Sequence, residues 1–173
     1  MEVHFNPETE SRLNELASQS GRPTHELVED AMAAYSGEVS QVRGMLDSRY
    51  DDLKSARVKS IDSEEAFGRL RRKNKSPRAL MKGFVLHPDA YKELEEIWEY
   101  IYADNPEAAD CIGEESRQTI HRLVQFPRQG HIRSDLTSRL LNLQPVREFL
   151  VVYAPEEAPL AVIAVLRGGV ALA

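Results

Sequence analysis

The chain has 173 residues, of which 42% are hydrophobic, so it can form one ordinary domain or two small ones. A single cysteine excludes an internal disulfide framework and any multi-cysteine metal site. We expect Cys111, which lies in a helical pattern, to be a small buried thiol. The sequence contains no run of about 18 apolar residues, and its first ten residues, MEVHFNPETE, lack the order of a secretory signal. We therefore expect a cytoplasmic protein with no membrane contact.

The net charge of −6 is distributed unevenly along the chain. Residues 1–54 carry 11 acids and 5 bases, residues 55–80 carry 3 acids and 8 bases, and residues 81–173 carry 14 acids and 9 bases. A short basic segment thus lies between two acidic blocks. It is either a solvated linker or an element that docks on an acidic surface.

Residues 1–36 predict a strand followed by two helices. In MEVHF the apolar and polar side chains alternate, as they do in a half-buried strand. Asn6 can cap the first helix, Pro7 suits its first turn and Gly21 ends it. Thr24 can cap the second helix, whose apolar side chains recur at helical spacing. Because one strand is unstable alone, the pattern predicts pairing with a second copy of the chain.

This order of elements, with the turn Ser20-Gly21-Arg22, resembles the ribbon-helix-helix family of bacterial DNA-binding proteins. In that family two chains form an antiparallel ribbon that enters the major groove. The resemblance implies a homodimer, or a higher oligomer built on it, that binds operator DNA. The acidic charge of this block is a departure, because affinity for DNA rests largely on basic contacts, so a purely dimerising ribbon is the alternative. The implied DNA-binding residues are Glu2, His4, Asn6, Arg22 and Thr24.

Residues 37–80 predict a continued helix to about residue 58, a short helix that begins near Asp62, and a basic boundary, RLRRKNKSPR. This layout resembles ParD-type antitoxins, in which a dimerising domain is followed by an amphipathic tail that lies across the toxin. The resemblance implies a toxin-neutralising tail and linker. Its expected toxin contacts are Leu53, Ile61, Phe67 and Leu70. The alternative is that these four residues form the core of a small domain.

Residues 81–173 predict a strand over 84–86, two helices that begin at Pro88 and Pro106, and three further strands. The three strands correspond to SRLLNLQ, VREFLVVYA and PLAVIAVLR, which Pro145 and the turn PEEAP separate. The expected fold is α+β, with a helical hairpin on an antiparallel sheet. The acids Glu93, Glu95, Glu96 and Glu99 predict a solvated helix face rather than an acid/base pair.

Several motifs of this half, in the same order, resemble ParE-type toxins of the ParE/RelE superfamily. They are HPDA with LEEIWEYI and DNPEAA, then FP, GH and DLT, and finally VREF with Tyr153. The resemblance spans residues 81 to about 167. It implies a type II toxin-antitoxin fusion with a ribbon-helix-helix domain at 1–36, a neutralising tail at 37–80 and a toxin domain at 81–173. The tail would bind its toxin domain within one chain or across the dimer.

Toxins of the ParE type bind DNA gyrase and trap its cleaved-DNA state, whereas those of the RelE type cut messenger RNA on the ribosome with several Lys and Arg side chains. Lys82 and Lys92 are the only lysines of this half, so gyrase is the expected target. The chain ends in GGVALA where relatives continue with an Arg-rich tail, which predicts a weakened toxin. The expected toxin surface comprises Arg133, Arg139, Arg147, Tyr153 and Arg167.

No phosphate-binding loop, HExxH motif or Cys/His cluster occurs in the sequence. We therefore expect no catalytic residue, no cofactor and no metal. Two other functions stay open. One is an autorepressor that carries an inactive toxin remnant, and the other is a RelE-like ribosome-dependent endonuclease.

Overall fold

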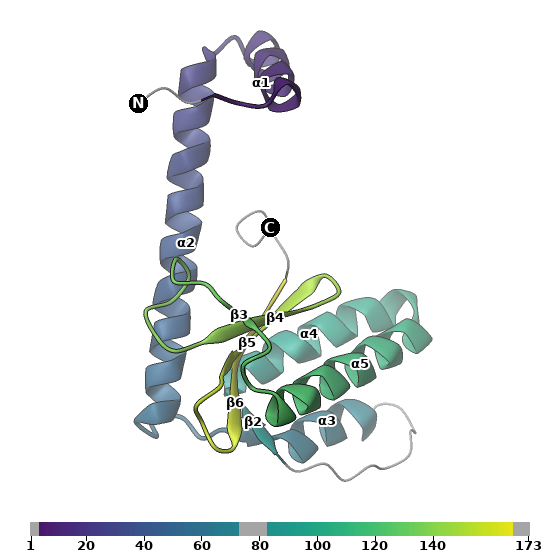
Figure 1. Cartoon of the computed structure of the whole chain (residues 1–173). Coiled ribbons are helices and arrows are strands. Elements are labelled where there is room, and N and C mark those ends of the chain that lie inside the picture. The colour runs from purple at the N-terminus through teal and green to yellow at the C-terminus, as the bar shows by residue number, and fades with distance from the viewer. Residues whose placement is uncertain (1–3, 73–82, 168–173) are drawn as a thin grey trace. The chain divides into compact units, whose positions relative to one another are not determined.

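The computed structural model describes residues 4–72 and 83–167 (Figure 1). The chain divides into two compact units between Gln41 and Val42. Helix α2 (Thr24–Lys54) crosses this division, and its residues from Val42 onward belong to the second unit. Within the described ranges, no helix has the length and apolar character needed to cross a membrane.

The first unit contains helix α1 (Pro7–Ser20) and the beginning of α2. The Asn6 side chain caps α1 by accepting a hydrogen bond of 2.8 Å from the Thr9 amide. Gly21 ends the helix with a left-handed φ of 66°, which glycine adopts without a steric penalty. These predicted helix boundaries are confirmed. Of the predicted strand, residues 1–3 lie outside the described residues, while His4 and Phe5 form no strand.

The second unit begins with the later turns of α2, which ends at Lys54 rather than near residue 58. The chain then forms the short strand β1 (Ile61–Asp62) and helix α3 (Ser63–Arg72). The Asp62 carboxylate accepts a hydrogen bond of 2.8 Å from the Glu64 amide at the start of α3. The short helix was expected from the sequence, whereas β1 was not.

The remaining elements form an α+β domain around one sheet, with strand order β1-β2-β6-β5-β4-β3. Strands β2 and β6 pair in parallel and all other neighbours are antiparallel. The helical hairpin and the three later strands were predicted, whereas β3 was not. The bounds are β2 Phe84–Leu86, α4 Pro88–Asp104, α5 Pro106–Gln125, β3 His131–Ile132, β4 Asn142–Val146, β5 Phe149–Ala154 and β6 Leu160–Arg167.

Two local expectations are wrong. Pro145 lies within β4 instead of separating two strands. It is tolerated there because β3 pairs with β4 only at Asn142 and Leu143, which leaves the chain at Pro145 beside β5 alone. Cys111 is exposed on α5 rather than buried, because the buried stripe of this helix passes through other positions.

One face of the sheet packs against α3, α4 and α5 (Figure 1). Strand residues that alternate along β5 and β6 point into this core, as the period of a strand requires. A register shift at Val152/Tyr153 interrupts the β5–β6 ladder and changes the alternation in β6, so that Val162 and Val165 both reach the core.

The opposite face is covered by the part of α2 from Val42 onward. Val152 and Ile163, which lie outside the first core, are nevertheless fully buried. Leu46 of α2 is fully buried as well, and Leu53 lines a small pocket together with Ile163. Strands β5 and β6 are therefore buried on both faces, which explains their nearly continuous apolar character.

We predict that Phe67→Ala lowers the free energy of unfolding of the second unit by about 3–5 kcal/mol, because it leaves a cavity beside Phe84. The rings of Phe67 and Phe84 are 6.1 Å apart and nearly perpendicular, at 76°. Urea denaturation measures the change. Phe126→Ala is the control, since Phe126 is 56% exposed and its loss should change stability by about 0.5 kcal/mol or less. Equal effects of the two substitutions would contradict the packing of α3.

Candidate functional site

The candidate site is the interface between residues 42–72, called here the central segment, and residues 83–167, called the sheet domain. Both belong to the second unit of the structure. The central segment contributes the end of α2, strand β1 and helix α3. Its contacts with the sheet domain fall into four groups: a strand pairing with an apolar core, a loop contact, and two charged clusters.

The strand pairing and the apolar core involve β1 and α3. Strand β1 extends the sheet by pairing with β2, which places Ile61 opposite Leu86. Phe67 and Leu70 of α3 are buried in the core that contains Phe84. The side chains of Ile61, Phe67 and Leu70, expected from sequence as toxin contacts, thus all lie against the sheet domain. Their functional role stays a prediction.

The loop contact joins α2 to residues 137–139. Asp47 accepts hydrogen bonds from the Thr137 hydroxyl (2.6 Å), the Ser138 hydroxyl (2.6 Å) and the Ser138 amide (3.1 Å). One turn further along α2, Asp51 accepts two hydrogen bonds from the guanidinium of Arg139, at 2.9 and 2.6 Å. Two carboxylates of the central segment therefore satisfy the donors of one loop.

The loop contact shifts the pKa values of its acids. Burial by itself would raise the pKa of Asp47, but the hydrogen bonds from Ser138 and Thr137 outweigh it and lower the pKa below its ordinary value. The hydrogen bonds from Arg139 likewise lower the pKa of Asp51. Both carboxylates are thus ionised at neutral pH, and the contact loses stability as the pH falls through these lowered values.

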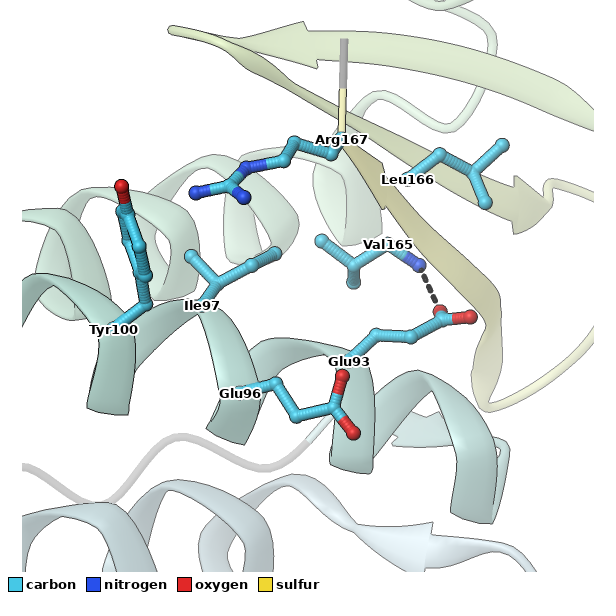
Figure 2. A pocket seen from close by; sticks show the side chains of 7 residues that line it. All are labelled: Glu93, Glu96, Ile97, Tyr100, Val165, Leu166 and Arg167. Atoms are coloured by element: carbon cyan, nitrogen blue, oxygen red, sulfur yellow. Dashed lines mark hydrogen bonds between the residues drawn. The ribbon is translucent and has the colours of Figure 1, made fainter. Parts of the chain in front are cut away.

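The first charged cluster centres on Glu93 of α4. Its carboxylate accepts a hydrogen bond of 2.7 Å from the Arg49 guanidinium. It also accepts one of 2.8 Å from the Val165 amide of β6, which Figure 2 shows. Burial raises the pKa of Glu93, while these hydrogen bonds oppose the rise. The expectation that Glu93 belongs to a solvated face is therefore wrong, because α2 and β6 enclose its carboxylate.

The same region of α4 and β6 borders a pocket of about 390 Å³. Figure 2 shows Arg167 above the ring of Tyr100, with 4.5 Å between the guanidinium carbon and the ring centroid. This geometry is that of a cation–π contact. The pocket is lined by Glu93, Glu96, Ile97, Tyr100, Val165, Leu166 and Arg167.

The second charged cluster joins the end of α2 to Glu157, in the turn before β6. The Glu157 carboxylate accepts hydrogen bonds from the Tyr50 hydroxyl at 3.1 Å and from the Lys54 ammonium at 2.6 Å. This carboxylate raises the pKa of Lys54, and burial followed by the same carboxylate raises that of Tyr50. Leu53 lies beside them in a pocket of about 180 Å³ whose other wall includes Val85.

The residues expected to contact DNA lie in or near the first unit. Glu2 is outside the described residues, and His4 is exposed. Asn6 caps α1, and Thr24 is the first residue of α2. Arg22 makes ion pairs with Asp30 at 2.7 Å and with Glu26 at 3.3 Å, so its charge is engaged within its own chain.

The residues expected on the toxin surface are not brought together. Arg133 pairs with Asp135, Arg139 with Asp51 and Arg147 with Glu115. Arg167 lies over Tyr100 instead.

Tyr153 is a correction to the expected toxin surface, because its side chain is fully buried. Its hydroxyl donates a hydrogen bond of 2.8 Å to the Pro127 carbonyl and accepts one of 3.0 Å from the Gly130 amide. The tyrosine therefore fixes the chain after α5 to β5.

Sequence reasoning missed the charged half of the interface. Asp47, Arg49, Asp51 and Glu93 lie on helices, where charged side chains are usually solvated. Nothing in their local spacing separates them from the exposed acids around them. Among the residues that the structure describes, no three His, Cys, Asp or Glu side chains are grouped as a metal site.

The fold and interface together define a small α+β domain whose sheet is covered on both faces, partly by the segment that precedes it. Residues 84–170 match the family described as the ParE toxin of the type II toxin-antitoxin system parDE. This match covers half of the chain, and the chain therefore belongs to the ParE toxin family. A comparison with curated proteins gives no match.

We predict that Arg49 and Glu93 are energetically coupled. Their side chains are 14% and 23% exposed, and removing the guanidinium leaves an uncompensated carboxylate in a partly buried site. In a double-mutant cycle of Arg49→Met and Glu93→Gln, the coupling energy should be about 1–3 kcal/mol. The control pair is Arg12 and Glu8, which are 76% and 80% exposed and should couple by about 0.5 kcal/mol or less. A coupling of zero for Arg49 and Glu93 would rule out the contact.

Proposed function

We propose that this protein is a self-neutralised toxin-antitoxin protein, in which the central segment inhibits the ParE toxin domain of the same chain. The observation that carries the proposal is the double role of residues 42–72. They add a strand and a buried helix on one side of the toxin sheet and cover its opposite face. A tail of an antitoxin that lies across its toxin would make these contacts.

The covalent connection supports inhibition within one chain. When a short flexible linker joins two binding segments, each segment experiences the other at an effective concentration on the order of mM. Inhibition would then not depend on the concentration of the protein, whereas separate antitoxin and toxin chains would dissociate on dilution.

We propose DNA gyrase as the target of the freed toxin domain. Ribosome-dependent cleavage needs several cations that converge on a phosphate. In the described part of the sheet domain, Arg133 pairs with Asp135 of its own loop and Arg147 with Glu115 of α5, while Arg139 pairs with Asp51 of the central segment, so these three cations do not converge on one point. Lys92 pairs with Asp89 on the surface of α4. This distribution favours a binding toxin over a nuclease.

We predict that residues 81–173 expressed alone stop growth and cause gyrase-dependent DNA breaks, while the full chain does neither. Co-expression of residues 1–80 should restore growth. DNA breaks are measured in cells with ordinary gyrase, and cells whose gyrase allele resists the toxin serve as the reference. Transcript cleavage in place of DNA breaks would assign the RelE-like activity, and a harmless fragment that is folded by circular dichroism would mean an inactive toxin remnant.

The rescue itself has a matched pair of variants. Residues 1–80 that carry F67A and L70A should fail to restore growth, because both side chains are buried against the toxin sheet. The same fragment with E38A should still restore it, since Glu38 lies at an exposed position of α2. Rescue that is independent of Phe67 and Leu70 would argue against this interface.

We further propose that the first unit dimerises as a ribbon-helix-helix domain and binds operator DNA, which would make the protein an autorepressor. Two consecutive helices, α1 and α2, with Gly21 in the turn between them support this proposal. Large apolar side chains of this unit are exposed in the single chain, among them Leu16, Met32 and Tyr35. A second copy of the chain would cover them.

We predict a dimer by sedimentation and a shifted band with DNA from upstream of the gene. His4→Ala should weaken this DNA binding by about tenfold, because it removes one contact to a base edge worth about 1–3 kcal/mol. Glu38→Ala, at an exposed position of α2, is the control and should bind as the unchanged protein does. A monomer with no affinity for this DNA would refute the proposal for the first unit.

A further inference from the structure

The loop of residues 137–139 contacts the carboxylates of Asp47 and Asp51 only through hydrogen-bond donors. The donors are two hydroxyls, one backbone amide and the Nε and Nη2 groups of Arg139. These five donor groups make six hydrogen bonds to Asp47 and Asp51, which measure between 2.6 and 3.3 Å. Such a set of donors is built for an anion.

The shape of this loop rests on bonds within the sheet domain. The Arg139 amide donates a hydrogen bond of 3.0 Å to the Thr137 hydroxyl, and the Arg139 guanidinium donates one of 3.0 Å to the Ser138 hydroxyl. Both of these hydrogen bonds lie within the loop itself and involve no residue of α2.

The chemistry of the donors matches a phosphate oxyanion. Phosphate groups in protein complexes are held by Arg forks, by Ser and Thr hydroxyls and by backbone amides. Two carboxylates one helical turn apart, at positions i and i+4, present four oxygen atoms to such a loop. Asp47 and Asp51 are thus in a position to replace the oxygen atoms of a phosphate ligand.

We propose that the loop of residues 137–139 is a phosphate-binding site of the toxin domain, and that Asp47 and Asp51 occupy it in the closed arrangement. The regulatory part of this inference rests on the proposed function, because it identifies the closed arrangement with the neutralised toxin. Phosphate ligand and central segment exclude each other at this loop. The phosphate would come either from the backbone of a nucleic-acid strand or from a small phosphate compound.

The test uses the full chain with the site emptied by D47A and D51A. Inorganic phosphate should raise the Tm of this variant by about 3–6 °C at ten times the dissociation constant, measured against chloride at equal ionic strength. The unchanged protein should show no such rise, because its own carboxylates fill the loop. R139Q in the D47A/D51A background should abolish the rise.

A charge-matched control separates this site from the effect of lost acids. D104A/E107A removes two exposed acids at the tip of the α4–α5 hairpin and should respond to phosphate as the unchanged protein does. If D47A/D51A does not fold, D51A alone frees the Arg139 fork and should give a smaller rise that R139Q removes. Absence of a rise in both variants would overturn the site.

The two sources of phosphate are distinguished by a short single-stranded oligodeoxynucleotide without terminal phosphates. Fluorescence anisotropy would show it binding to D47A/D51A, with loss on R139Q, if the site takes a nucleic-acid backbone. Binding of inorganic phosphate alone assigns a small ligand. A toxic fragment rescued by residues 1–80 without any phosphate response would refute the site only. A phosphate response with a harmless, folded fragment would refute the proposed function only.

Discussion

The burial of the toxin sheet on both faces is the constraint on which the second unit depends. Strands β5 and β6 carry apolar side chains on each side, so that either face left in water would cost about 25 cal/mol for every Å² of apolar surface. The helical hairpin and α3 cover one face, and the end of α2 covers the other. The central segment therefore buries apolar surface on both faces of the sheet.

The polar contacts of α2 with the sheet domain fix its position, which the apolar contacts do not. Burial is not directional, whereas an ion pair or a carboxylate hydrogen-bonded to a loop fixes one register of a helix on a sheet. Asp47 and Asp51 accept hydrogen bonds from residues 137–139, and Arg49 and Lys54 form ion pairs with Glu93 and Glu157. Sliding α2 by one turn would separate all of these pairs together, so they specify its position.

The sequence predicts what local patterns determine. Capping residues and helical spacing identified α1, the hairpin α4–α5 and the short helix α3, and motif order identified the toxin family. Strands β1 and β3 have two residues each and form only by pairing with β2 and β4. No local sequence pattern therefore predicts them. The charged side chains of the interface were missed for a similar reason. Whether a helical Asp or Arg is solvated or paired is decided by the element that covers it.

The parallel pairing of β2 with β6 joins the beginning of the toxin domain to its last described strand. During translation, residues 42–72 leave the ribosome before residues 83–167, and β2 lacks its partner β6 until residues 160–167 follow. Under the proposed function, the antidote is thus already synthesised when its toxin becomes able to fold. Under the same proposal, each molecule would be inhibited as soon as its toxin domain folds, and a cell that makes this protein would not contain the toxin before its inhibitor.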